Sequence, residues 1–176
     1  MSKFKVFLPV LSRVMVAVAC VALALFVAGC EIFESYTPVY QISLHQFSGK
    51  EIYDSRLARV VNDPQTGIRR QVKTIGFLDS SRIASGKVLK EQEDGKCGIS
   101  LELDRFGVHT LLHLSGSMPG DQFAIVIDGF YVGTGTFPPH RINGENTLEL
   151  PPLWSRKEAW KIVRQITKNY DHYNHK

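Results

Sequence analysis

Two histidines placed four residues apart are the first candidates for chemistry in this chain of 176 residues. His109 and His113 fall in a segment with helical periodicity, where this spacing brings two imidazoles to one face, as in a metal-binding pair. Neither is followed by the glutamate of a His-Glu-x-x-His zinc site, and no third ligand has a compelling position. We expect two surface or partly buried histidines, with a hydrolase or metal-dependent enzyme as the alternative. Asp171, His172 and His175 are expected in a frayed polar end and not in a metal site.

The other reactive side chains lack the neighbours that catalysis needs. Cys97 alternates with apolar residues, which predicts a buried and inert thiol. Ser115-Gly116-Ser117 lacks the Gly-x-Ser-x-Gly frame of a nucleophile elbow. Gly129, Gly133 and Gly135 precede a Pro-Pro bend and not a helix, so they do not form a phosphate-binding loop. The sequence therefore predicts no catalytic, cofactor-binding or metal-binding residue.

The first 29 residues have the order of a bacterial secretory signal. Val14 to Val27 is an uninterrupted apolar stretch, and it closes at Val27-Ala28-Gly29-Cys30. The positive residues of the leader are Lys3, Lys5 and Arg13. The last four residues resemble the lipobox of bacterial lipoproteins. That resemblance implies that residues 1–29 are cleaved, that Cys30 carries acyl chains such as palmitate, and that residues 30–38 form a lipidated tether.

Two alternatives to this processing are less consistent with the sequence. Cys20 is separated from Arg13 by only six residues, too few for an apolar region of ~7–15 residues. An uncleaved anchor over Val14 to Gly29 would be about 24 Å long, against a hydrocarbon core of ~30 Å. By resemblance to the sorting rule of enteric lipoproteins, Glu31 in place of Asp implies attachment to the outer membrane, facing the periplasm.

Removal of the signal nearly balances the charge. The whole chain has 21 basic and 17 acidic residues, and the signal contains three of the basic residues and none of the acidic ones. The remaining 18 and 17 give no reason to expect a nucleic-acid partner. Cys97 is then the one cysteine without lipid, so the fold depends on a hydrophobic core and not on a disulfide.

The clearest local pattern is a hairpin over Phe123–Val132. Phe123 to Ile127 has the composition of a strand buried on both faces. Asp128-Gly129 favours the positive φ angles of a two-residue turn, and Phe130 to Val132 supplies the returning strand. We expect this hairpin at the centre of a sheet. We also expect Asp128 to serve the turn alone, so that asparagine would replace it almost silently.

Alternating and turn-bounded patterns place the other elements. Cys97 to Leu103 is the most regular amphipathic strand, and Asp104 is predicted to cap a following helix. The apolar side of that helix is expected to include Val108, Leu111 and Leu112, and Ser115–Gly120 is expected to be a loop. The further expected segments are strands at 40–44, 57–61 and 68–77, a helical turn from 79 or 80 to 86, and a short last strand at Leu148 and Leu150.

The last element has a specific start. Ser155 and Glu158 form a capping box, and Trp154 and Ala159 occupy the positions of a hydrophobic staple. The spacing of the apolar residues that follow predicts a helix from 155 to about 169. The expected domain organisation is therefore a signal at 1–29, a tether at 30–38, one domain at 39–170 and a polar tail at 171–176.

From Asp79 to Ile166 the order of these pieces resembles the head subdomain in the first periplasmic region of SecD, a subunit of the bacterial protein-export machinery. The motifs that carry the resemblance are Ser81 to Val88, Ile99 to Asp104 with Gly107, Gly120 to Gly129, and Trp154 to Ala159. The resemblance covers roughly half of the chain. It implies a single α+β domain with a mostly antiparallel sheet and two main helices on one side. Such motifs specify a fold and carry no catalytic residues.

The expected function is therefore a lipid-anchored, non-enzymatic interaction module in the periplasm, with a protein or peptide partner in the cell envelope. No counterpart of the membrane segments of SecD is present in the sequence, so the chain resembles a detached head that is linked to protein export or envelope assembly. Phe130, Tyr131 and Phe137 form an aromatic, β-rich stretch that could offer an edge to an extended peptide. The alternative is that these aromatic residues cover the core.

Overall fold

The computed structural model describes residues 36–49, 54, 56–64, 66–138 and 146–175. The chain divides into two units, Met1–Thr37 and Pro38–Lys176, and the second contains all of the described strands and helices. The predicted signal and Cys30 lie outside the described residues. Within the part of the chain that is described, no helix is both long and apolar enough to cross a membrane.

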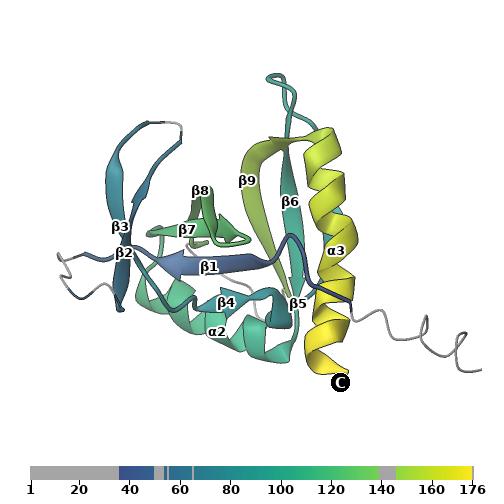
Figure 1. Ribbon diagram of the computed structural model, residues 1–176, viewed down its shortest axis with the longest axis horizontal. Helices are drawn as coiled ribbons and strands as arrows, with labels where there is room; N and C mark the ends of the chain where they lie inside the picture. The colour runs from purple at the N-terminus through teal and green to yellow at the C-terminus, as the bar shows by residue number, and fades with distance from the viewer. Residues whose placement is uncertain (1–35, 50–53, 55, 65, 139–145, 176) are drawn as a thin grey trace, which may run out of the picture. The chain divides into compact units, whose positions relative to one another are not determined.

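Three antiparallel sheets make up most of the domain (Figure 1). The four-stranded sheet has the order β4-β1-β7-β8, formed by Leu78–Asp79 (β4), Ile42–Gln46 (β1), Gln122–Ile127 (β7) and Phe130–Thr136 (β8). The three-stranded sheet has the order β5-β6-β9, formed by Ile83–Val88 (β5), Lys96–Leu103 (β6) and Thr147–Ser155 (β9). The third sheet is a hairpin of Ala58–Asn62 (β2) and Arg69–Lys73 (β3). The helices are the 3₁₀ turn η2 (Ser80–Arg82), α2 (Arg105–Ser117) and α3 (Arg156–Asn174).

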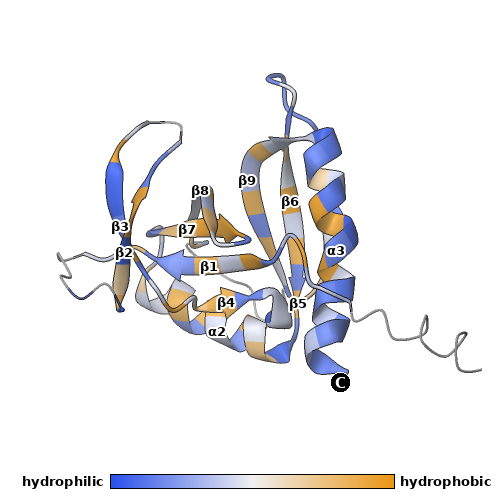
Figure 2. Cartoon of the chain, viewed as in Figure 1, coloured by the Kyte–Doolittle hydropathy of each residue, from blue (hydrophilic) through white to orange (hydrophobic). Residues whose placement is uncertain are grey.

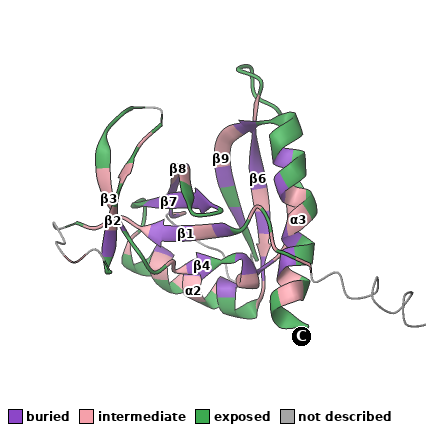
Figure 3. Cartoon of the chain, in the orientation of Figure 1, coloured by how far each residue is buried: buried purple, intermediate pink, exposed green. Residues whose placement is uncertain are grey.

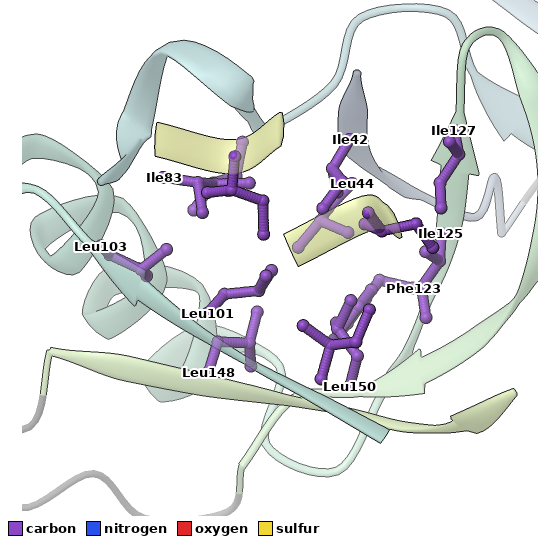
Figure 4. Packing of buried hydrophobic residues seen from close by; sticks show 14 of the residues in the cluster. Ile42, Leu44, Ile83, Leu101, Leu103, Phe123, Ile125, Ile127, Leu148 and Leu150 are labelled. Carbon is purple, nitrogen blue, oxygen red and sulfur yellow. The ribbon is translucent and has the colours of Figure 1, made fainter. Parts of the chain in front are cut away.

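The hydrophobic core lies between the four-stranded and three-stranded sheets. Figure 4 shows side chains of β1 and β7 directed toward those of β6 and β9. Phe123 of β7 fills the centre, because Gly135 on the neighbouring strand has no side chain and the phenyl ring lies directly against it. The ring of Phe123 also contacts those of Phe77 and Phe137, with centroids 5.7 and 5.0 Å away. These three rings form an aromatic cluster within the core.

Both helices begin at caps that the sequence predicts. The Gly107 amide donates to Asp104 Oδ1 at 2.7 Å, and Ser155 forms the full capping box with Glu158. A cap of this kind contributes about 1 kcal/mol. α3 packs chiefly along β5, where a side chain at Gly86 would meet the Ile166 methyl group.

The predicted fold class is confirmed: the domain is small, its sheets are antiparallel and two helices cover them. The alternating strand Cys97 to Leu103 is β6, and its four apolar side chains are buried. Figure 3 shows buried positions recurring among exposed and half-buried ones along α3, where they are three or four residues apart. Phe123 to Ile127 is buried along its whole length, as expected for an interior strand.

Two predictions of where a helix ends are wrong. The helical turn expected to reach Gly86 ends at Arg82, and β5 begins at Ile83 because this segment pairs with β6. The segment Ser115–Gly120, expected to be a loop, is still helical through Ser117. Ser115 continues the buried face of α2 that Gly107 and Leu111 begin.

Three further elements differ from expectation. The short last strand is nine residues long and continues through two prolines to Ser155. The last helix ends at Asn174 and not near residue 169, so Asp171 and His172 belong to its final turn. The helix is held there by long-range hydrogen bonds, among them Asn174 Nδ2 to the Ser81 carbonyl at 2.9 Å. In the 123–132 hairpin, β7 lies inside the sheet but β8 is at its edge within the described residues.

The role predicted for Asp128 is incomplete. Asp128 and Gly129 have φ angles of 48° and 84°, which is the expected two-residue turn. In addition, the carboxylate accepts the backbone N–H groups of Tyr40 at 2.9 Å and Gln41 at 2.8 Å. The Asp128 amide donates in turn to the Gln41 carbonyl at 2.9 Å. We call these three hydrogen bonds the Asp128 clamp, because they fix the chain just before β1 begins.

Asp128→Asn is therefore expected to be destabilising and not silent. An amide offers one acceptor oxygen, and its NH₂ group opposes one of the two backbone donors. We expect a loss of about 1–2 kcal/mol in the free energy of unfolding, less than for a buried site because the clamp is solvent-exposed. Urea unfolding of the full-length protein measures this loss. Asp121→Asn is the matched control, and equal midpoints for the two variants would contradict the clamp.

Candidate functional site

A groove of about 1070 Å³ opens at the end of the four-stranded sheet that lies next to the β2–β3 hairpin. Its walls come from the end of β1, the hairpin, the C-terminal end of α2 and the start of β7. Its lining side chains include those of Gln46, Phe47, Val60, Arg69, Arg70, Gln71, Met118 and Gln122. We call this cavity the hairpin groove.

The wall formed by Phe47 is built by an extension of β1. Phe47 pairs with Val72 of β3 in a single antiparallel bridge. The next residue, Ser48, donates its amide to the Gln71 carbonyl at 2.9 Å. These contacts tie the end of β1 to the hairpin, so that the hairpin packs on the four-stranded sheet.

Arg70 spans the groove wall. Its guanidinium carbon lies 4.6 Å from the centre of the Phe47 ring, in a cation–π contact. Its Nη1 donates to Gln122 Oε1 at 2.8 Å, which joins β3 to β7. The Phe47 ring also meets the Tyr131 ring edge-on, with centroids 6.4 Å apart. One side chain thus links three strands around the cavity.

The groove combines amide groups with adaptable apolar surface. Gln46 accepts from Lys73 Nζ at 2.6 Å and lies 3.8 Å from the sulfur of Met118. Amide side chains can donate to and accept from a peptide backbone, and methionine adapts its shape to different neighbours. The lining includes two arginines, Arg69 and Arg70, and one acid, Asp121.

The hairpin presents apolar side chains to solvent. Figure 2 shows apolar segments interleaved with hydrophilic ones along β2 and β3. Leu57 and Ile68 are slightly more than half exposed, and Val60 is half exposed. Ile75, just beyond β3, is exposed as well. Val60 of this group also lines the groove.

His45 of β1 is a buried side chain that contacts the β2–β3 hairpin. Its side chain is only 6% exposed. Nδ1 donates to the Lys73 carbonyl at 2.9 Å, and the Ser43 hydroxyl lies 2.9 Å from Nε2. Burial lowers the pKa of His45, the Lys73 carbonyl opposes this shift, and the nearby charge of Arg59 adds to it. The neutral imidazole therefore joins β1 to β3.

The residues singled out in the sequence do not converge on a site. His109 and His113 are exposed on α2, and neither lines the hairpin groove. Among the described residues, no group of three or more His, Cys, Asp or Glu side chains is placed to hold a metal ion. Cys97 is completely buried in the core. In the last helical turn, His175 Nε2 lies 3.7 Å from Asp171 Oδ1.

The aromatic stretch after the turn is divided among three environments. Phe137 is buried in the core. Tyr131 is half-buried beside the groove, with its hydroxyl 2.7 Å from Thr134 Oγ1, and burial raises its pKa. Phe130 is 76% exposed, at the opposite end of β8 from Phe137. The alternative that the aromatics cover the core is thus correct for Phe137 alone.

The sequence analysis did not identify the groove residues. Phe47, Arg70 and Gln122 are far apart in the sequence, and no motif connects them. The adjacent pair Arg69-Arg70, in a strand that follows a predicted turn, was the one local feature that could have drawn attention to this hairpin.

No protein-family model and no curated protein matches this chain. Solved structures do match its fold. One is reported as the structure and function of a membrane component, SecDF, that enhances protein export; it is 12% identical, with a TM-score of 0.50, over 74% of this chain and 63% of that chain. Another, a crystal structure of SecDF in a super-membrane-facing form, is 16% identical, with a TM-score of 0.52, over 73% of this chain and 18% of that chain.

The resemblance to SecD predicted from the motifs is confirmed as a resemblance of fold. It extends over about three quarters of the chain, whereas the motifs covered about half. This chain spans less than two thirds of either SecDF chain.

The buried imidazole of His45 makes stability depend on pH. Because its folded-state pKa is lowered, the unfolded chain binds a proton more readily than the folded one below pH ~6.5. The free energy of unfolding should be highest above that pH and fall as the pH drops, by at most about 1.4 kcal/mol per unit. His45→Phe should flatten this dependence between pH 7.5 and 5.5. His109→Phe, at an exposed position, should not, and the same slope in all three proteins would contradict the assignment.

Proposed function

We propose that this protein is a lipid-anchored, non-enzymatic component of the cell envelope whose SecD-like domain binds an extended segment of another polypeptide. Acylation at Cys30 would attach it to the outer membrane, with the domain facing the periplasm. The hairpin groove is the binding site in this proposal. The proposed partners of the protein are the membrane, through the lipid, and an envelope polypeptide, through the groove. The proposed function requires no cofactor.

The observation that carries the proposal is the construction of the groove around Arg70. This side chain holds Phe47 and Gln122 in place, so the cavity wall is ordered before a ligand arrives. A pre-ordered wall lowers the entropic cost of binding. Gln46 and Gln71 line the same cavity and add amide side chains to its wall.

The fold supports a link to protein export. SecDF is described as a membrane component that enhances protein export, and export machinery handles polypeptides that are not yet folded. A groove for extended chains on a related fold is consistent with that task. For this protein the proposed ligand class is an unfolded or extended segment of an envelope protein.

Arg70→Ala tests the groove. We expect it to weaken binding of a fluorescently labelled, unfolded polypeptide roughly tenfold, or about 1.4 kcal/mol, because Phe47 and Gln122 lose their common partner. Fluorescence anisotropy with the purified full-length protein in detergent measures the affinity. Arg164→Ala, at an exposed position on α3, is the matched control. Unchanged binding by Arg70→Ala, with thermal unfolding also unchanged, would exclude the groove as the site.

Cys30→Ala tests the anchor. Because lipid addition precedes cleavage of a lipoprotein signal, the variant should lack acyl chains and persist as a larger precursor. Metabolic labelling with a fatty acid, followed by the intact mass of the protein, distinguishes the two forms. Acyl labelling that survives the substitution would show that Cys30 is not the lipidated residue.

A further inference from the structure

A second group of exposed apolar side chains lies at the other end of β1 from the hairpin groove. Phe106 and Phe130 are 67% and 76% exposed, and Val39 and Tyr173 are also exposed. These four residues come from the segment before β1, the first turn of α2, the start of β8 and the last turn of α3. We call them the apolar end of the domain. Three of the four are aromatic.

Hydrogen bonds bring three of these segments together, and the start of α2 is not among them. Tyr173 Oη donates to Gln41 Oε1 at 2.7 Å, and the Gln41 amide donates to Asp128, two residues before Phe130. Asn169 Nδ2 donates to the Val39 carbonyl at 2.9 Å. α3, the segment before β1 and the β7–β8 turn therefore meet at one place.

The α2 start joins the same end through η2. Asn174 Nδ2 donates to the Ser81 carbonyl at 2.9 Å, and the guanidinium of Arg82 lies 4.9 Å from the centre of the Phe106 ring. A hollow of about 530 Å³ lies between η2, the β7–β8 turn and the end of α3. Its lining includes Ser81, Gly129 and Tyr173.

The acidic groups of this end are largely engaged within the domain. Asp79 accepts the amide and the hydroxyl of Ser81, and Asp128 forms the clamp described above. Asp104 caps α2 and lies 3.4 Å from Arg82. The last acid, Asp171, lies 3.7 Å from His175. Arg82 and Arg105 add positive charge beside Phe106, so the surface combines aromatic rings with guanidinium groups.

The length of the preceding chain limits how far this end can be from a lipid at Cys30. Pro38, where the folded unit begins, lies eight positions after Cys30. A fully extended chain of that length spans at most about 29 Å. The segment that follows Pro38 contains Val39 itself. If Cys30 is acylated as proposed, the apolar end is therefore the part of the domain held nearest to the bilayer.

We propose that the apolar end rests on the phospholipid bilayer, with its aromatic rings in the interfacial layer. Tyrosine favours that layer. Phenylalanine on a membrane-surface element is buried at the boundary of headgroups and acyl chains, and arginine binds lipid phosphate groups. This inference rests on the proposed lipid anchor and adds an orientation to it. Because β1 runs from the apolar end to the hairpin (Figure 1), docking at one end directs the hairpin groove away from the membrane.

Depth-dependent quenching tests this orientation. The full-length acylated protein is labelled with an environment-sensitive fluorophore at Phe130→Cys or, as the matched control, at Val60→Cys on the hairpin. Cys97 is buried and Cys30 carries lipid, so neither takes the label in the folded protein. In phosphatidylethanolamine and phosphatidylcholine vesicles with spin-labelled lipid, we expect several-fold stronger quenching at position 130 than at position 60. Adding Phe106→Ser should reduce the quenching at position 130.

The possible outcomes separate this inference from the anchor. Intact mass shows whether Cys30 is acylated before the vesicles are made. An acylated protein with equal quenching at positions 130 and 60 overturns the docking of the apolar end and leaves the anchor standing. A protein without acyl chains overturns the anchor, and the orientation inferred from it is then rejected as well.

Discussion

The clamp made by Asp128 fixes the strand on which the rest of the domain depends. Its carboxylate holds the amides of Tyr40 and Gln41, so β1 enters the sheet between β4 and β7 in one register. From there β1 gives Ile42 and Leu44 to the core and His45 to the hairpin contact. Without this strand the sheet would lose its connection to β4, and the hairpin would lose its base.

The same strand separates two surfaces of different character. At its C-terminal end, Phe47 extends the pairing to β3 and contributes to a groove with amide, aromatic and cationic groups. At its N-terminal end, exposed aromatic rings surround the point where the chain enters the fold. β1 is five residues long, which is roughly 17 Å. A short, rigid strand thus sets the orientation of one surface relative to the other.

Local patterns in the sequence predicted the elements whose causes are local. The alternation from Cys97 to Leu103, the Asp128-Gly129 turn and the capping box at Ser155 each depend on residues within a few positions. Contacts between distant segments decided what the sequence could not predict. The carboxylate of Asp128 meets residues nearly ninety positions away, and Arg70 meets Gln122 fifty-two positions away. Helix α3 likewise extends to Asn174 because Ser81 and Gln41 bind its last turn.

The binding of an extended polypeptide in the hairpin groove is the central claim, and hydrogen exchange tests it most directly. The full-length protein is compared with and without a reduced, unfolded polypeptide, and exchange is followed at each backbone amide. The account predicts slower exchange at Phe47 to Gly49, at Arg69 to Gln71 and at Asp121 to Gln122, with no change along α3. Protection confined to α3 or to the exposed face of α2, or none at all with saturating polypeptide, would contradict it.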